Sequence, residues 1–221
     1  MFFALTACGG GSSSSNNTVG PTGPVLPAFS RYAIHASGSV YRVDNDNGRL
    51  TYLHTFNNGG FPFASGATLA IHPTGSTVYG SCDADLICQF SIAVDGKLTE
   101  MLPRVATGND PRSTAIDPDG RYAYVANRGS DNLSRYQIEV DGRLTPLASP
   151  TISAGTTPVH ITVDPNGQFV YVANFTATMG NNTISLYAID PNDGTLSELS
   201  SSPLITYNTN LFDLVTTGSQ L

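Results

Sequence analysis

The sequence predicts an all-β fold built from repeated four-stranded antiparallel units. Three observations lead to this class. Glycine and proline are plentiful, with 22 and 14 copies among 221 residues, whereas charged residues make up only 12%, which is a turn-rich composition. A phrase of about 45 residues returns along the chain. The repeated region lacks the apolar spacing and the capping residues of a helix.

Three kinds of marker define the repeat. Pro-x-Gly turns recur at His72–Gly75, Asp117–Gly120 and Asp164–Gly167. Hairpin sequences recur at Asn47–Thr51, Asp95–Thr99, Asp141–Thr145 and Asp193–Ser197. Strand sequences recur at Tyr32–His35, Val78–Ser81, Tyr124–Asn127 and Tyr171–Asn174. The chain therefore contains four copies, of which the first lacks its opening strand.

The third copy, residues 112–149, shows how each unit is built. Its strands in order are RSTAID, RYAYVAN, NLSRYQIEV and RLTPLAS. The first pair is joined through the Pro-x-Gly turn, and Asp141-Gly142 joins the last pair. Asp-Gly between β-rich runs predicts a tight hairpin, because glycine accepts the positive φ that primed turns require.

A four-stranded sheet cannot bury both of its faces alone, so the units are expected to stack radially. Four strands in each period of about 45 residues indicate a β-propeller. The expected blades are residues 29–56, 66–103, 112–149 and 159–200, with the start of another blade at 210–221. The chain is therefore expected to be an open arc of about four blades and a fragment of a longer propeller. In a rival arrangement, a strand at 210–216 pairs with the strand near 31–36 and closes a four-bladed ring.

The first residues suggest export. Leu5-Thr6-Ala7-Cys8 resembles the bacterial lipobox, in which the cysteine becomes lipidated. We therefore expect a partial lipoprotein signal at 1–8, a flexible linker at 9–27 and the propeller domain at 28–221. Cys8 would anchor the protein in the cell envelope, at the outer membrane or on the periplasmic face. The alternative is a chance cysteine in a disordered tail.

Two phrases carry a family resemblance: DPDGRYAYVAN with DNLSRYQIEVDGRLTPL, and ITVDPNGQFVYVAN with NTISLYAID and DGTLSEL. They resemble the lactonase-type propellers, which include bacterial 6-phosphogluconolactonases, fungal muconate cycloisomerases and the similar YVTN-repeat surface proteins. The resemblance implies seven blades, about three of which this chain lacks. It implies hydrolysis of a sugar-type lactone, and with the lipobox-like LTAC sequence the expected protein is a lactonase-like lipoprotein. Because a fold does not fix a reaction, a non-catalytic surface propeller that binds a protein or glycan is the alternative.

Candidate site residues lie where loops meet at one end of the channel. Opening a lactone requires a base or a positioned water, and donors for the carbonyl oxygen. His160 and Arg112 are the predicted catalytic residues. The predicted substrate-binding residues are Ser113, Asn127, Arg128 and Asn174. The alternative is that this polar entrance only holds water and that the two asparagines brace their loops.

Metal, cofactor and nucleic-acid binding are not expected. DNDNG at 44–48 places its glycine one position too early for a calcium loop. A net charge of −7 argues against nucleic acid or an anionic membrane surface as a partner, so the only expected membrane contact is the lipid anchor.

Cys82 and Cys88 are expected to form a disulfide. By repeat alignment they replace Asn127 and Ser134, which face each other across one hairpin. In an exported protein such a pair is normally oxidised; two free thiols are the alternative.

Overall fold

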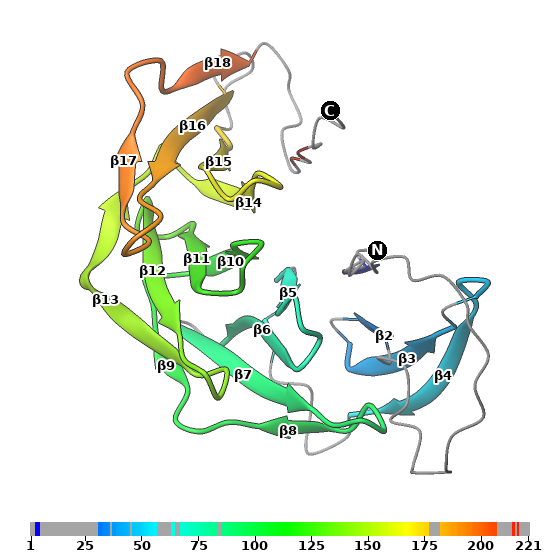
Figure 1. The fold of residues 1–221 in the computed structure, drawn as a ribbon. Helices are drawn as coiled ribbons and strands as arrows, with labels where there is room; N and C mark the ends of the chain where they lie inside the picture. Colours follow the sequence, from blue (N-terminus) through cyan, green and yellow to red (C-terminus); the bar gives the residue numbers. More distant parts are fainter. Residues whose placement is uncertain are drawn as a thin grey trace, which may run out of the picture.

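The computed structural model describes residues 3–4, 31–35, 37–44, 46–56, 63–64, 67–83, 85–176, 182–206, 214 and 216. Every regular element among them is a β-strand, and nothing in these ranges is a helix that could span a bilayer. Figure 1 shows four sheets side by side in an arc, with the inner strands toward a common centre and the outer strands at the rim. The predicted all-β, partial propeller architecture is confirmed.

Each sheet is an antiparallel meander that runs from the centre to the rim. The first blade contains β1 (Phe3–Ala4), β2 (Arg31–His35), β3 (Ser39–Val43) and β4 (Leu50–Thr55). The second contains β5 (Leu69–Ile71), β6 (Thr77–Cys82), β7 (Leu86–Ile92), β8 (Leu98–Glu100) and β9 (Val105–Ala106). The third contains β10 (Pro111–Ile116), β11 (Tyr122–Asn127), β12 (Asn132–Ile138) and β13 (Leu144–Ser153). The fourth contains β14 (Pro158–Val163), β15 (Phe169–Asn174), β16 (Asn182–Ile189), β17 (Leu196–Glu198) and β18 (Leu204–Thr206).

The outer strands extend beyond the predicted blade ends. In the second and fourth blades the outer strand is interrupted by a segment that contains a proline, Pro103 or Pro203. Pairing then resumes, since β9 pairs with β7 and β18 pairs with β16. The sequence-based boundaries miss these second halves.

The inner edge of the first blade corrects one expectation about the N-terminus. Residues 1–27 were expected to lie outside the fold, yet β1 pairs antiparallel with β2, where the missing first strand would stand. An open sheet edge presents unpaired N–H and C=O groups, which an extended segment can satisfy. Cys8 and the linker at 9–27 lie outside the described residues.

The hydrophobic core lies between blades, which explains why the repeat exists. Each of three buried clusters joins two neighbouring blades, and one contains Tyr124 of β11 together with Tyr187 of β16. The buried Tyr124 hydroxyl donates to the Gly194 carbonyl at 3.0 Å, and Tyr79 donates to Gly142 at 2.7 Å. The tyrosine of one copy therefore binds the Asp-Gly hairpin of the next.

The two ends of the arc lie apart in Figure 1. Most of segment 210–216 lies outside the described residues, so its predicted strand stays a prediction. Thr216, which is described, donates its hydroxyl to the Val163 carbonyl of β14 at 3.1 Å. This contact is on the inner strand of the fourth blade, whereas the rival closed ring requires pairing with β2.

Candidate functional site

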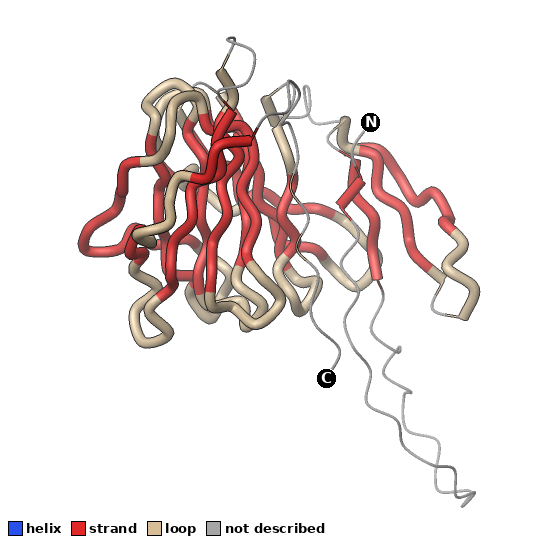
Figure 2. Tube along the Cα trace, turned by 90° about the horizontal axis from the view of Figure 1, so that it is seen from above, coloured by secondary structure: helices blue, strands red, loops and turns tan. Residues whose placement is uncertain are grey.

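The candidate site is formed by loops at one of the two loop faces that Figure 2 shows above and below the strands. The loop before β10 meets the loop between β11 and β12, because the Arg128 amide donates to the Asp110 carbonyl at 2.9 Å. In the fourth blade, the Phe175 amide donates to the Thr157 carbonyl at 3.0 Å. The predicted convergence of these loops is confirmed.

Three charged side chains form a cluster on this face, which we call the Asp110 cluster: Asp110, Arg112 and Arg128. Asp110 Oδ1 lies 3.1 Å from Arg112 Nε, and Asp110 Oδ2 lies 2.7 Å from Arg128 Nε. One carboxylate thus holds two guanidinium groups, and the cluster keeps one net positive charge. All three side chains are partly exposed, so a ligand at this face can reach them.

Backbone strain also collects on this face. The four non-glycine residues with positive φ in the described chain are Asp83, Asp110, Asp131 and Thr157. Each lies either before the first strand of a blade or between its second and third strands. For a β-branched residue such as Thr157, at φ +54°, this conformation is a true outlier. It is held because the Thr157 amide donates to Asp131 Oδ1 at 2.7 Å, which joins the third and fourth blades. Strain of this kind clusters at functional sites.

Ser113, a predicted substrate-binding residue, connects blades instead. It is fully buried, and its hydroxyl accepts from Thr68 Oγ1 at 3.0 Å and from the Ile161 amide at 3.3 Å. The inner strands of three successive blades are therefore linked through Thr68, Ser113 and Ile161. With no exposed surface, Ser113 positions β10 against β14 and is not placed to touch a ligand.

His160, the predicted base, lies on β14 next to this link. Its register partner is Ala173, just as Ser113 pairs with Ala126, so the two positions are equivalent. His160 is half-buried. Arg112 and His160 therefore lie on neighbouring inner strands, each one residue away from the Ser113–Ile161 hydrogen bond.

The asparagines predicted to bind substrate act as braces. Asn127 is fully buried, and its Nδ2 donates to Asn132 Oδ1 at 2.8 Å and to Ser134 Oγ at 2.9 Å. Asn174, also fully buried, donates to Ser185 Oγ at 2.9 Å. This geometry fits the alternative that the two asparagines brace their loops. Neither side-chain amide has exposed surface that a ligand could contact.

The disulfide occupies the same place in the second blade. Cys82 and Cys88 are bonded, with their Cα atoms 5.6 Å apart, which confirms the predicted pairing. Both are fully buried. A covalent bond thus replaces the Asn–Ser hydrogen bond of the third and fourth blades.

Asp110, at the centre of the cluster named for it, was not identified as a site residue from the sequence. A buried arginine outside the site, Arg135 of β12, was not identified either. Arg135 is buried, and its Nη2 donates to the carbonyls of Ser149 and Thr151. Burial lowers the pKa of this guanidinium. A signal for Asp110 existed, because its equivalent in the fourth copy is the uncharged Thr157.

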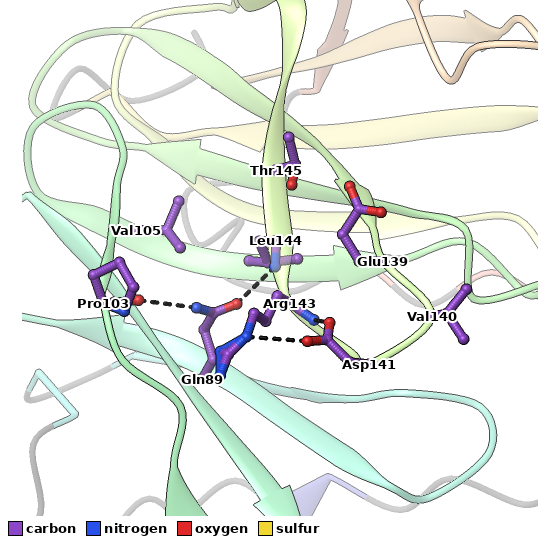
Figure 3. A pocket seen from close by; sticks show the side chains of 9 residues that line it. All are labelled: Gln89, Pro103, Val105, Glu139, Val140, Asp141, Arg143, Leu144 and Thr145. Carbon is purple, nitrogen blue, oxygen red and sulfur yellow. Dashed lines mark hydrogen bonds and ion pairs between the residues drawn. The ribbon is translucent and has the colours of Figure 1, made fainter.

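Two open cavities of the described chain lie away from this face. One, of about 430 Å³, sits at the rim between the second and third blades (Figure 3). Gln89 fills its floor, accepting from the Leu144 amide at 2.7 Å and donating to the Pro103 carbonyl at 3.1 Å, while Arg143 pairs with Asp141. These polar groups bind one another, so the cavity is a seam between blades. Within the described ranges, no group of His, Cys, Asp and Glu is arranged to hold a metal.

Comparison with known proteins identifies the family. The family model described as a lactonase, seven-bladed β-propeller, matches residues 34–160 and 114–211. The chain belongs to this lactonase family. A 6-phosphogluconolactonase of Sodalis glossinidius (strain morsitans) is 35% identical over 85 residues, which are 37% of this chain and 25% of that protein. A 6-phosphogluconolactonase of Enterobacter sp. (strain 638) is 28% identical over 130 residues, which are 54% and 39%. The chain thus spans well under half the length of these curated relatives.

Solved structures share the fold. A functionally unknown protein from Desulfotomaculum acetoxidans aligns with a TM-score of 0.61 and 20% identity, over 76% of this chain and 51% of that one. The periplasmic gluconolactonase of Pseudomonas aeruginosa aligns with a TM-score of 0.57 and 19% identity, over 76% and 52%. At these identities the likeness establishes the propeller architecture alone.

Proposed function

We propose that this chain forms part of a lactonase propeller that opens a sugar-type lactone at the loop face of the third and fourth blades. The observation that carries the proposal is the Asp110 cluster, in which Arg112 lies on β10, next to the His160 strand, and Arg128 lies in the β11–β12 loop. Membership of the lactonase family supports the reaction class, and relatives named 6-phosphogluconolactonase support a sugar-type ring.

The chemistry assigns one role to each group. A lactone carbonyl oxygen gains negative charge when water attacks, and charged N–H donors stabilise such an oxyanion strongly. Arg112 and Arg128 supply these donors. His160 removes a proton from the attacking water as general base. When the ring C–O bond breaks, the imidazolium returns that proton to the ring oxygen, and a hydroxy acid is the product.

The test is hydrolysis of D-glucono-1,5-lactone by the full chain and by His160→Ala. Loss of a general base lowers the rate by about a hundredfold or more. The matched control is His72→Asp, because His72 lies in a turn on the opposite face and aspartate is the equivalent residue in the next two copies. A rate for His160→Ala equal to that of the control would remove His160 from the mechanism.

A non-catalytic propeller that binds a protein or glycan is the second candidate. It is favoured by one observation: Ser113, which lines up with His160, serves to link blades. In this case the wild-type chain would not accelerate lactone opening above the spontaneous rate, and it would be retained on a glycan array or by a protein partner.

We also propose that the protein is anchored to the cell envelope through a lipid on Cys8. The lipobox-like LTAC sequence supports this placement. Expression with an upstream signal peptide should give incorporation of labelled palmitate, and Cys8→Ala should lose it. A labelled Cys8→Ala protein, or an unlabelled parent, would contradict the proposal.

A further inference from the structure

The Asp110 cluster is a departure from the repeat. The register pairs Pro111 with Asn127 and Pro158 with Asn174. The fourth blade therefore has Thr157, Val159 and Phe175 where the third has Asp110, Arg112 and Arg128. In the second blade, Ala67 and Asp83 stand at the two arginine positions. Blade packing alone does not require the three charged side chains of the Asp110 cluster, since the neighbouring blades fold without this set.

Asp110 is not needed to make its turn. Its φ of +50° is matched by φ +54° at Thr157, so the same loop shape forms without a carboxylate. Partly exposed ion pairs add little to the stability of a fold. What remains specific to Asp110 is that its carboxylate pairs with both guanidinium groups, most closely with Arg128 Nε at 2.7 Å, and cancels one of their two charges.

The surrounding loops add negative charge. Asp83, Asp85 and Asp131 lie in the second-to-third strand loops of the same face. Arg104, which reaches this region from the outer strand, is already paired with Asp83 and Glu100. Among the described residues, this face therefore offers fixed hydrogen-bond donors without a large excess of positive charge. A phosphate ester would bring close to two negative charges at neutral pH, which such a face does not balance.

We propose that Asp110 is a specificity-determining residue that makes the site favour an unphosphorylated sugar lactone over its phosphorylated counterpart. This inference rests on the proposed function, since the ligand is the lactone of that reaction. By pairing with Arg128 at Nε, Asp110 leaves the Nη donors of that arginine for the oxygens of a neutral ligand. By cancelling one charge, it weakens binding of a dianion.

The experiment compares the wild-type chain, Asp110→Asn and the control Asp119→Asn. Asparagine tolerates the left-handed backbone, and Asp119 is an exposed aspartate paired with Arg121 in a turn on the opposite face. The readout is the ratio of kcat/KM for D-glucono-1,5-lactone to that for its 6-phosphate. The wild type should favour the neutral lactone by about tenfold or more. Asp110→Asn should lower this ratio about tenfold, raising KM for the neutral lactone, and Asp119→Asn should stay within about twofold of wild type. A wild type that prefers the phosphorylated lactone, or an unchanged ratio in Asp110→Asn, would overturn the inference.

A second measurement separates this inference from the proposed function. If the wild type opens neither lactone, the proposed function fails, and inorganic phosphate then probes the charge of the face directly. Phosphate at 10–50 mM should raise the Tm of Asp110→Asn by more than about 2 °C relative to phosphate-free buffer, without raising that of wild type or Asp119→Asn. Equal shifts in all three proteins would refute the role of Asp110.

Discussion

Replacing the disulfide of the second blade with two serines, Cys82→Ser with Cys88→Ser, should destabilise the chain by about 2 kcal/mol. The two cysteines are six residues apart. Closing so short a loop removes about 8 cal/mol/K of entropy from the unfolded chain, which is about 2 kcal/mol at 25 °C. Because both sulfur atoms are buried, two hydroxyl groups in their place would not recover this free energy. For a chain of this length, the Tm should fall by about 4–8 °C.

The assay is calorimetry of the oxidised wild type and the double-serine variant at one protein concentration. The matched control is Asn127→Ala with Ser134→Ala, which removes the hydrogen bond at the equivalent place in the third blade. This control tests whether the brace position matters in a blade without a covalent bond. Thiol titration should find no reactive Cys82 or Cys88 in the wild type. If the double-serine variant melts within 1 °C of a fully oxidised wild type, the reasoning about this brace is wrong.

Three further predictions concern the packing between and within blades. Asn174 Oδ1 is buried without a partner in the described chain, whereas Asn127 Oδ1 in the third blade accepts from Thr107 at 2.8 Å. Because Ala154 stands at the position equivalent to Thr107, Ala154→Thr should stabilise the chain by about 1 kcal/mol in urea denaturation. No gain in stability would contradict the equivalence of the two positions. Tyr124→Phe should lower the free energy of unfolding by about 1–3 kcal/mol, because the Gly194 carbonyl is left without its donor. The control is the equivalent, half-buried Tyr171, where substitution by Phe should change stability by less than about 0.5 kcal/mol. Equal losses in the two variants would refute the role of the Tyr124 hydroxyl in linking blades. Burial is the main cause that raises the pKa of Asp117 above its ordinary 3.8, so the native state keeps this proton at a higher pH than the unfolded state does. Relative to Asp117→Asn, the stability of the wild type should therefore fall as pH rises through the ordinary pKa toward the raised one. An opposite slope in pH-dependent melting would contradict this prediction.

The sequence predicts most of the blade architecture because each marker acts locally. Asp-Gly at 141–142 makes a hairpin wherever it stands between strand-forming residues, and the observed φ of +85° at Gly142 is the one that such a turn needs. Cys82 and Cys88 could be paired because the alignment places them on the two adjacent strands of one hairpin, and in the structure they lie diagonally across it.

The parts that the sequence did not predict depend on contacts between segments. The Asp110 carboxylate reaches Arg128 only when the loop before β10 meets the β11–β12 loop. The sequence of either loop alone does not predict this contact. Ser113 lies at the same register position as His160, yet its hydroxyl is consumed by neighbouring blades. Pairing of β1 with β2 depends on an open sheet edge, which is a property of the folded arc.

A comparison of initial rates decides whether the Asp110 cluster belongs to a lactone-opening site. The initial rate of D-glucono-1,5-lactone hydrolysis is measured for the wild type, Arg128→Ala and Arg121→Ala, after subtraction of the spontaneous rate. Arg121 is a matched control, because it is an equally exposed arginine whose ion pairs lie in a turn of the opposite face. We expect a wild-type rate above background. Arg128→Ala should lower this rate about 10²-fold, as for removal of one oxyanion donor. Arg121→Ala should stay within about twofold of the wild-type rate. Equal rates for the two arginine variants, or a wild-type rate equal to background, would contradict the assignment of the cluster to that site.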